Sequence, residues 1–385
     1  MSNIVVTCAP KISPILLNEI NDLGYQAELS GEKAVKLEGS MHDAWKLNFH
    51  LRTANRVLFQ LFEGVAKNAD ELYKLAIAFR WEDWIDKKGY FGIDSFVQNP
   101  TIKDLRFANL RLKDAIADRF SQRFGMRPDS GNEKTGVALF LHWQEEEVKV
   151  YVDTTGESLS KRGYREEAGR APLQETLAAA IILSTQWDGT THFINPMCGS
   201  GTLVIEAALM AIGKYPGHLR EEYAFMHLKN FNQSEWNRAR RSYAKPKNKP
   251  DNLPKFIATD INKHVIPKAE RNAFRAGVNE FIDFEVSDFR QTQLPDGKGV
   301  VVLNPEYGER MGEEEQLVPI YEAIGDFFKQ KCAGKTGYIF TGNLDLAKSV
   351  GLKPNQKTHL MNGKIECRLL GYEMYEGSRK QKNQG

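Results

Sequence analysis

The residues with the clearest capacity for chemistry follow a short apolar run, in VVLNPEYGERMG at 301–312. The run predicts a buried strand, and the chain then continues through Asn304, Pro305, Glu306 and Tyr307. The Asn304 amide oxygen and the Pro305 carbonyl can each accept a hydrogen bond, and the Tyr307 ring can stack on a flat partner. Ordinary turns seldom contain a large ring at such a point, so this stretch predicts a site for a planar group that carries an amine.

A glycine loop follows another predicted strand, in FINPMCGSGTLVIEAALMA at 193–211. Gly199 and Gly201 would let the backbone approach a ligand closely, and a helix beginning at Thr202 would offer free N–H groups. The dinucleotide fingerprint is incomplete, because Val204 stands where its third glycine belongs, and no Gly-Lys-Ser/Thr sequence follows. The loop is therefore not expected to hold a pyrophosphate.

Two aspartates stand at the ends of the next two predicted strands, Asp260 in FIATDIN and Asp288 in EVSDF. Ligands of an open α/β sheet bind outside the carboxyl ends of the strands, where Asp260 can accept both ribose hydroxyls and Asp288 an adenine amine. Each aspartate alone is equally well explained as a helix N-cap. Polar groups at four successive strand ends favour a ligand site instead.

Together these strand ends predict S-adenosylmethionine as the cofactor, because it carries a ribose and an adenine and needs no phosphate-binding loop. The exocyclic amine of a nucleobase is a poor nucleophile, since its lone pair is delocalised into the ring. Hydrogen bonds to Asn304 and Pro305 would draw that nitrogen towards pyramidal geometry, and Tyr307 would fix the plane of the base. The sulfonium is already a good leaving group, so positioning is expected to carry most of the catalysis.

Several motifs resemble one known family. NPMCGSGTLVIEAA and NPEYGERMG resemble the glycine and N-P-P-Y motifs of amino-directed nucleic-acid methyltransferases. LRTANRVL, LRLKDAIADRF, KRGYREEAGRAPLQETLAAA and NGKIECRLLGYEMYEG extend the likeness over nearly the whole chain. The chain resembles the THUMP-domain RNA guanine-N2 methyltransferases, in particular the N-terminal half of those that act on bacterial 23S ribosomal RNA. The resemblance implies methylation of the N2 amine of a guanosine in RNA, with 23S ribosomal RNA as the expected substrate.

The resemblance also implies a fold and a domain order. We expect an α/β class I methyltransferase domain, a Rossmann-like doubly wound sheet with an antiparallel C-terminal hairpin, preceded by a ferredoxin-like and THUMP α+β region that binds RNA. Alternation of strands and helices after Gly156 predicts the doubly wound sheet independently. The expected domains are ferredoxin-like at 1–60, THUMP at 61–156 and methyltransferase at 157–385, with a basic insertion at about 213–255. The pattern of 41–62 predicts one long amphipathic helix.

The resemblance assigns roles to individual residues, and Asn304, Pro305 and Tyr307 are expected to hold the target base. The expected cofactor-binding residues are Arg165, Pro172, Leu173, Glu175, Asn195, Met197, Cys198, Gly199, Ser200, Gly201, Thr202, Asp260, Ile261, Asp288 and Phe289. Two positions depart from the family: Asn195 stands where Asp is common, and Glu306 replaces the second proline. The Glu306 carboxylate can itself accept a hydrogen bond from the target amine, which makes it a further catalytic-site residue and leaves the choice between guanine and adenine open.

The net charge is only +2, but two segments are strongly basic. Residues 101–127 contain seven Lys or Arg and three Asp, and residues 213–255 contain ten Lys or Arg and four acids. Such patches suggest a polyanionic partner, although solvated helix faces explain them equally well. The expected contacts with RNA phosphates are Lys103, Arg106, Arg111, Lys113, Arg119, Arg123, Arg127, Arg238 and Arg241.

Composition and spacing argue against several other classes. No run approaches the ~18 apolar residues of a membrane helix, and the start MSNIVVTCAP lacks the features of a secretory signal. Four cysteines without a C-x-x-C pair and eight histidines without ligand spacing predict neither a zinc site nor a disulfide framework. We therefore expect a cytoplasmic protein, monomeric or weakly dimeric, with no metal and no membrane partner.

Three other functions stay open on the sequence. N6-adenine methylation of DNA or RNA uses the same N-P-x-Y chemistry, but the N-terminal half resembles an RNA-binding region rather than a DNA recognition domain. Guanine-N2 methylation of transfer RNA fits the same motifs. The third is a non-catalytic RNA-binding or ribosome-assembly protein, although neither the cofactor loop nor the amide is lost. The incomplete glycine fingerprint argues against an oxidoreductase.

Overall fold

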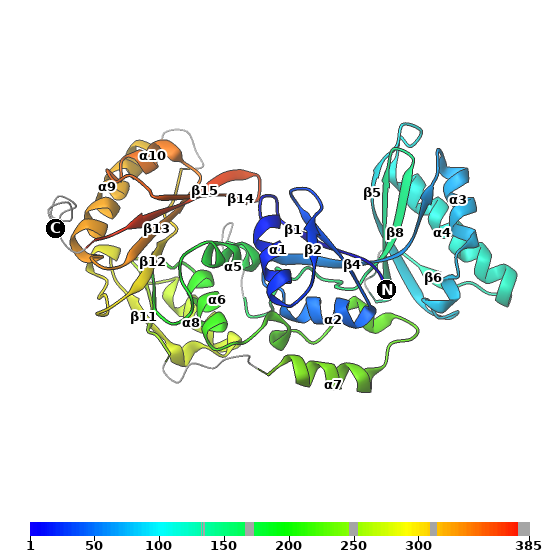
Figure 1. Cartoon of the computed structure of the whole chain (residues 1–385), viewed down its shortest axis with the longest axis horizontal. Helices are drawn as coiled ribbons and strands as arrows, with labels where there is room; N and C mark the ends of the chain where they lie inside the picture. The colour runs from blue at the N-terminus through cyan, green and yellow to red at the C-terminus, as the bar shows by residue number, and fades with distance from the viewer. Residues whose placement is uncertain (132, 134, 166–172, 246–252, 309–313, 376–385) are drawn as a thin grey trace. The chain divides into compact units, whose positions relative to one another are not determined.

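The computed structural model describes residues 1–131, 133, 135–165, 173–245, 253–308 and 314–375, which form two compact units (Figure 1). Unit 1 takes the described residues of Met1–Cys8, Leu16–Leu159 and Arg220–Lys245, and unit 2 those of Ala9–Ile15, Ser160–Leu219 and Pro246–Gly385. Within these ranges no helix is long and apolar enough to cross a membrane. The same residues include no group of three or more His, Cys, Asp or Glu side chains placed to hold a metal ion.

Unit 1 is built on an eight-stranded sheet with the order β2-β3-β1-β4-β8-β7-β5-β6. Neighbouring strands pair antiparallel except for β5, which is parallel to both β7 and β6. The long strand β4 (Ala54–Val65) is central, since it pairs with β1 on one side and β8 on the other. The other strands are β1 (Ser2–Cys8), β2 (Ala27–Leu29), β3 (Ala34–Gly39), β5 (Tyr90–Gln98), β6 (Asp129–Ser130), β7 (Val137–Gln144) and β8 (Glu147–Asp153).

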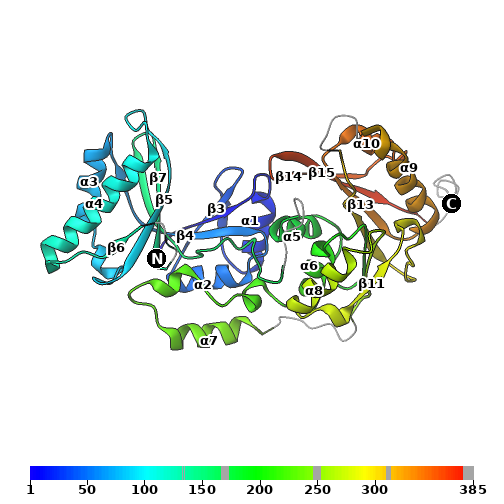
Figure 2. The same cartoon turned by 180° about the vertical axis from the view of Figure 1, so that it is seen from behind.

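Four helices accompany this sheet along the chain. Helices α3 and α4 pack together, and α4 also contacts β5 (Figures 1 and 2). Helix α4 ends before Gly125, its C-cap, which adopts a left-handed φ of 66° that a glycine tolerates best. The helices are α1 (Ser13–Asp22), α2 (Met41–His50), α3 (Ala69–Ala78) and α4 (Leu105–Phe124), with a short 3-10 turn, η1, at Trp81–Asp83.

The long helix predicted over 41–62 is wrong in its second half. Helix α2 stops at His50, and the chain then enters the central strand β4. The Glu19 carboxylate accepts hydrogen bonds from the backbone N–H groups of Arg52 and Thr53, which turns the chain out of the helix. Pairing of β4 with two neighbouring strands then overrides the local helical pattern.

The segment Arg220–Lys245, expected within the methyltransferase region, packs in unit 1. It contains a 3-10 turn, η3 (Ala224–His227), and the helix α7 (Gln233–Tyr243), which lies beside α2 in both views (Figures 1 and 2). The buried ring of Trp236 meets Trp45 of α2 edge to face, with ring centroids 5.8 Å apart. Burial of such rings attaches this basic segment to unit 1.

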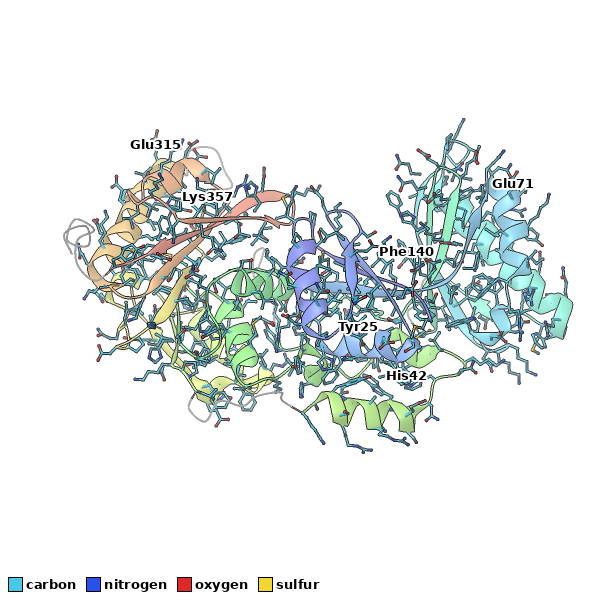
Figure 3. The ribbon with its side chains drawn as sticks, in the orientation of Figure 1. Tyr25, His42, Glu71, Phe140, Glu315 and Lys357 are labelled. Atoms are coloured by element: carbon cyan, nitrogen blue, oxygen red, sulfur yellow. The ribbon has the colours of Figure 1, made fainter. Side chains whose placement is uncertain are left out.

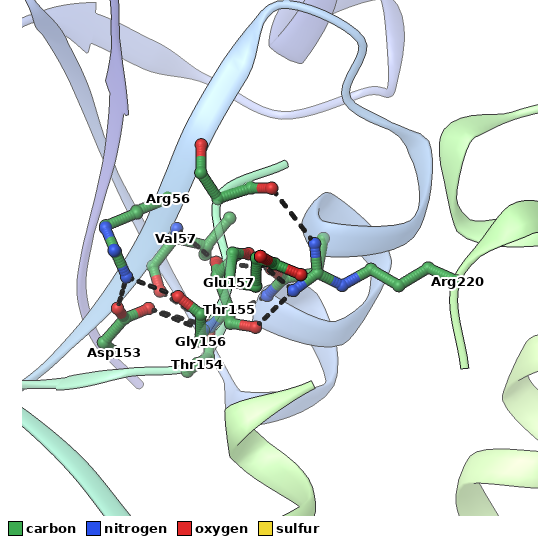
Figure 4. Close-up of polar contacts among 10 residues, drawn as sticks. Arg56, Val57, Asp153, Thr154, Thr155, Gly156, Glu157 and Arg220 are labelled. Atoms are coloured by element: carbon green, nitrogen blue, oxygen red, sulfur yellow. Dashed lines mark hydrogen bonds and ion pairs between the residues drawn. The ribbon is translucent and has the colours of Figure 1, made fainter. Parts of the chain in front are cut away.

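Arg220 anchors the start of this segment (Figure 4). Its guanidinium donates hydrogen bonds to the backbone carbonyls of Thr155 and Glu157, which follow β8. On the same stretch Arg56 of β4 forms an ion pair with the buried Asp153. Two arginines that lie far apart in the sequence therefore hold the turn after β8.

Unit 2 is built on a seven-stranded sheet with the order β11-β10-β9-β12-β13-β15-β14. Strands β9 to β13 pair parallel, whereas β15 is antiparallel to both β13 and β14. This confirms the expected doubly wound sheet with an antiparallel C-terminal hairpin. The strands are β9 (His192–Pro196), β10 (Phe256–Asp260), β11 (Ile282–Val286), β12 (Gly299–Leu303), β13 (Thr336–Thr341), β14 (Gln356–Asn362) and β15 (Ile365–Glu373).

Helices cover both faces of this sheet, with α5, α6 and α8 on one face and α9 and α10 on the other (Figures 1 and 2). They are α5 (Glu175–Leu183), α6 (Thr202–Ala211), α8 (Ile266–Ala276), α9 (Glu314–Lys331) and α10 (Leu344–Lys348), with short 3-10 turns at Pro216–Leu219, Asn279–Phe281 and Phe289–Gln291. Every residue of β12 is buried, as a central parallel strand requires. Val301 and Leu303 pack in one cluster with Tyr321 and Ile324 of α9.

Candidate active site

A cavity of about 910 Å³ lies at the carboxyl ends of the parallel strands in unit 2. The segments after β9, β10, β11 and β12 all contribute to its wall, as in other open α/β sheets. The predicted site residues that line it are Leu173, Met197, Cys198, Gly199, Ser200, Thr202, Asp260, Ile261, Asp288, Phe289, Asn304, Pro305 and Glu306. The fold therefore brings the four polar strand ends to one place.

The glycine loop between β9 and α6 passes through left-handed backbone at Met197, Gly199 and Gly201, with φ of 67°, 54° and 82°. A methyl group added at Gly199 would meet no atom of the described residues within 4 Å, its own chain neighbours aside, so a ligand can approach the backbone there. A methyl group at Gly201 would lie 3.1 Å from the Ala269 Cβ, so this glycine lets α6 pack closely on α8. Gly199 thus leaves room for a ligand, and Gly201 allows the two helices to pack.

Asp260 ends β10 and is oriented by the backbone around it. Its carboxylate accepts hydrogen bonds from the N–H groups of Gly199 and Asn262, each at 2.9 Å. These two donors leave further acceptor capacity on the carboxylate for a ligand. The arrangement suits a carboxylate that binds the hydroxyls of a ribose.

Asp288, which follows β11, is already engaged by a neighbour. Arg290 donates to it through its backbone N–H and its side-chain Nε, both at 2.9 Å, and also through Nη2. The Arg290 guanidinium holds the pKa of Asp288 below its ordinary value. An adenine amine would have to share this carboxylate with Arg290, a competition that the strand-end pattern does not reveal.

The Asn304 side chain contains a hydrogen-bond acceptor that no described residue satisfies. Its Oδ1 atom is buried and accepts no hydrogen bond from any residue that the structure describes. The Asn195 Oδ1 atom is also buried and unpaired among the described residues, but Asn195 does not line the cavity. Its Nδ2 atom donates to the Val302 carbonyl at 2.8 Å and so joins β9 to β12. A buried polar atom left unpaired is unfavourable by roughly 1–3 kcal/mol. Since Asn304 lines the cavity, a ligand entering the cavity can supply the missing donor.

Glu306 and Tyr307 lie in different surroundings. Glu306 is exposed and belongs to the cavity wall. Tyr307 is half-buried, does not line the cavity, and accepts a hydrogen bond on its hydroxyl from Asn362 Nδ2 at 2.7 Å. Stacking of Tyr307 on a base would therefore take place beside this cavity rather than inside it.

Arg165 and Glu175 support the glycine loop without lining the cavity. Arg165 pairs with Glu175 at 3.2 Å and donates to the Leu173 carbonyl at 2.8 Å and the Thr202 hydroxyl at 3.1 Å. Burial raises the pKa of Glu175, and the Arg165 cation opposes that rise. Pro172, predicted beside them, lies outside the described residues.

Two helices supply cavity residues that the sequence analysis did not name. Asn272 of α8 donates to the Ser200 carbonyl at 3.1 Å and thereby holds the glycine loop. The added residues include Lys268, Arg271 and Asn272 of α8, and Pro319, Ile320 and Ala323 of α9. Lys268, Arg271 and Asn272 are spaced by three and four residues and therefore share one face of α8. This spacing of polar residues in the helix after Asp260 could have identified them from the sequence.

All five cations predicted to bind RNA on α4 have carboxylate partners within unit 1. The pairs are Arg106–Asp104, Arg111–Asp70, Lys113–Asp114, Arg119–Glu82 and Arg123–Glu82, with N···O distances between 2.7 and 3.8 Å. Lys103 and Arg127, which flank the helix, are exposed and form no ion pair with a described residue. On α7, Arg238 and Arg241 are likewise exposed and unpaired within the described chain.

Three family models match the chain in sequence order. They are the RlmL ferredoxin-like domain over residues 3–58, the THUMP domain over residues 66–153 and the RMKL-like methyltransferase domain over residues 162–370. The last of these covers more than half of the 385 residues. The matches confirm the expected fold class and the resemblance to THUMP-domain methyltransferases.

Known proteins similar to this chain carry related names. The ribosomal RNA large subunit methyltransferase K/L of Syntrophotalea carbinolica is 35% identical over 383 residues, which cover 96% of this chain and 53% of that protein. The chain thus spans about half the length of the curated relatives it matches.

Solved structures agree with this assignment. A predicted N6-adenine-specific DNA methylase from Listeria monocytogenes superposes with a TM-score of 0.86 at 30% identity, over 97% of this chain and 96% of that one. SMU.472 in complex with SAH superposes with a TM-score of 0.87 at 26% identity, over 98% and 99%. S-adenosylmethionine is accordingly the cofactor of the methyltransferase domain, and this chain belongs to the RMKL-like methyltransferase family.

Proposed function

We propose that this protein methylates the N2 amine of a guanosine in RNA, and that its substrate is 23S ribosomal RNA. When bound, S-adenosylmethionine would supply the methyl group. The guanine N2 atom would form a bond to the methyl carbon as the carbon–sulfur bond of the sulfonium breaks, and the amine would lose a proton to water. The protein itself positions the two reactants and contributes no general acid. Asp260 and the glycine loop would hold the cofactor, and Asn304 and Pro305 would hold the amine.

The buried Oδ1 atom of Asn304, which accepts no hydrogen bond from a described residue, carries this proposal. An acceptor at the cavity wall is satisfied by an N–H group of the ligand. An exocyclic amine has two N–H groups, one for Asn304 and one for the Pro305 carbonyl, while its nitrogen lone pair faces the methyl group. Asp260 and Gly199, which would hold the cofactor, line the same cavity. The cavity therefore has fitting groups for both reactants.

Glu306 favours guanine over adenine. Guanine presents two neighbouring donors, N1–H and the N2 amine, whereas adenine places the N1 lone pair beside its N6 amine. A carboxylate on the cavity wall can accept a charge-assisted hydrogen bond from guanine N1–H, but it would face the lone pair of adenine. Replacement of the second motif proline by Glu306 thus supports guanine as the target.

RNA as the substrate is supported by the THUMP match and by the relatives named as ribosomal RNA methyltransferases. The exposed cations Arg238 and Arg241, together with Lys103 and Arg127, are the side chains that we propose contact RNA phosphates. Such contacts make binding fall steeply with salt. The chain itself thus offers cations in unit 1 for binding and a methyltransferase cavity in unit 2 for chemistry.

The test is methyl transfer from labelled S-adenosylmethionine to ribosomal RNA from cells that lack this protein, followed by digestion to nucleosides. We expect label in N2-methylguanosine, and we expect Asn304→Ala to lower the rate by about 100-fold or more while cofactor affinity is retained. Asn279→Ala is the matched control, because Asn279 is exposed and does not line the cavity. Glu306→Gln should reduce the preference for guanine.

Other results would each support a different function. Label in N6-methyladenosine would establish the adenine alternative. Label only in transfer RNA would show that transfer RNA, and not ribosomal RNA, is the substrate. Cofactor binding without transfer to any RNA would favour a binding or assembly protein. An Asn304→Ala variant as active as wild type would remove the main support for the mechanism.

A further inference from the structure

Three elements of unit 2 meet at Tyr307. Tyr307 follows β12, Gly342 directly follows β13, and Asn362 is the last residue of β14. Asn362 Nδ2 donates to the Tyr307 hydroxyl at 2.7 Å. A methyl group added at Gly342 would lie 2.8 Å from Ile365 Cγ2, 3.0 Å from Cδ2 of the Tyr307 ring and 3.1 Å from Cε2 of that ring, so the ring edge and Ile365 both leave no room for a side chain there. The hydroxyl and one edge of the ring are therefore both fixed.

The backbone that carries Tyr307 is held as well. The Tyr321 hydroxyl of α9 donates to the Glu306 carbonyl at 3.3 Å and lies 2.8 Å from the Thr341 hydroxyl, which immediately precedes Gly342. Burial raises the pKa of Tyr321 to about 12, so it stays protonated at neutral pH. One tyrosine thus ties together the segment that bears the Tyr307 ring and the segment beneath that ring.

We propose that Asn362 and Gly342 are positioning residues for Tyr307, and that the β14–β15 hairpin is therefore part of the site for the target base. This inference rests on the proposed function. The phenol hydroxyl accepts a hydrogen bond from Asn362 and also forms one with the Cys367 side chain. We therefore expect Tyr307 to act on the base through its ring face. Gly342 is required because a side chain there would collide with Ile365 and with the Tyr307 ring, and would push the ring out of the plane in which it meets the base.

A double-mutant cycle tests the role of Asn362. The single-turnover rate of methyl transfer to ribosomal RNA from cells lacking this protein is measured for Asn362→Ala, Tyr307→Phe and the double variant. Each single variant should lose about fivefold, the effect of one hydrogen bond, with unchanged cofactor affinity. The double variant should lose no more than Tyr307→Phe alone, because that change already removes the bond to Asn362. Additive losses would overturn the inference, as would wild-type rates in both single variants.

Gly342→Ala tests the contact with the ring and should lower the rate by at least tenfold. Its control is Gly337→Ala on β13, where a methyl group would lie 2.6 Å from the Phe328 ring and disturb the core without touching Tyr307. Lys357→Ala controls for the hairpin, because Lys357 is exposed near the other end of β14 (Figure 3). Both controls should keep the wild-type rate once the folded fraction is matched.

The outcomes separate this inference from the proposed function. Equal rate losses in the two glycine variants would show that Gly342 acts through stability alone and would overturn its assigned role. A wild-type protein that transfers no methyl group to any RNA would overturn the proposed function first and this inference with it. An active wild type with additive variants would overturn this inference alone.

Discussion

Helices α4 and α7 of unit 1 carry similar densities of cations in the sequence, but the fold uses them in opposite ways. On α4, Arg119 binds both oxygens of Glu82 and also the carbonyls of Ile77 and Ala78 at the end of α3. On α7, buried Trp236 attaches the helix, and the nearby Arg238 stays exposed. The cations of α4 chiefly join parts of unit 1, whereas Arg238 and Arg241 of α7 are available to a partner.

The difference teaches that a count of charges does not identify an RNA surface. Glu82 and Asp70, which neutralise three arginines of α4, lie outside the segment in which the charges were counted. A charge that already has a carboxylate partner must give it up, or share it, to bind a phosphate. We therefore place the main phosphate contacts on α7 and on the flanks of α4, and the following predictions test that division.

The largest expected effect is on stability, from Glu82→Gln. Glu82 is nearly buried and pairs with Arg119, whose side chain is also mostly buried, and with Arg123. Removing the carboxylate leaves two cations without their partner and should lower the stability of the α3–α4 region by about 3 kcal/mol. Hydrogen exchange of the α3 and α4 amides measures this loss. Arg238→Gln is the control and should leave the exchange unchanged.

The same contact predicts a pH dependence of stability. The Arg119 guanidinium lowers the pKa of Glu82 from 4.5 to about 2. A carboxylate with a depressed pKa in the folded state stabilises fully above the unfolded value, and the gain is lost as pH falls from about 4.5 to about 2. The difference in stability between wild type and Glu82→Gln should therefore shrink over that interval. A difference that stays constant down to pH 2 would show that the ion pair is not the source of the stability.

The next effect is on RNA binding, from the double variant Arg238→Gln/Arg241→Gln. Loss of two phosphate contacts should weaken binding about tenfold and reduce the slope of log affinity against log salt by about 1.5. Filter binding of ribosomal RNA at several salt concentrations gives both quantities. The matched control is Arg119→Gln/Arg123→Gln, which should change stability more than RNA affinity. If the control loses more RNA affinity than the α7 variant, the division between the two helices is wrong.

The sequence predicted best those site residues that lie at or directly after the end of a strand. Asn304 and Asp260 each follow an apolar strand, and parallel strands bring their carboxyl ends to one edge, so local patterns place both residues. The hydrogen bonds from Arg290 to Asp288 were not predicted, although the two residues are close in sequence. A pattern of strand ends does not indicate which nearby side chain folds back onto the carboxylate. Contact of Tyr307 with Asn362 depends on a hairpin that lies 55 residues further along the chain.

The fold was predicted better in unit 2 than in unit 1 for a similar reason. Alternating strands and helices define a doubly wound sheet with little ambiguity. In unit 1 the pattern of 41–62 satisfies a helix period throughout, and only the pairing of β4 with strands from both halves of the unit decides against it. The segment Arg220–Lys245 packs in unit 1 through aromatic contacts such as that of Trp236 with Trp45. No local sequence pattern identifies which rings pair in this way.

The smallest expected effect is the sharpest test of the comparison, and it comes from Arg106→Gln. Arg106 pairs with Asp104 on the surface, and the arginine side chain is 87% exposed. Such pairs add little stability and are screened by salt, so we expect no measurable change in unfolding and less than about a twofold change in RNA affinity. Filter binding beside Arg241→Gln decides the point. A loss as large as that of Arg241→Gln would mean that RNA opens the exposed pair, in which case only buried pairs such as Arg119–Glu82 exclude a cation from the RNA surface.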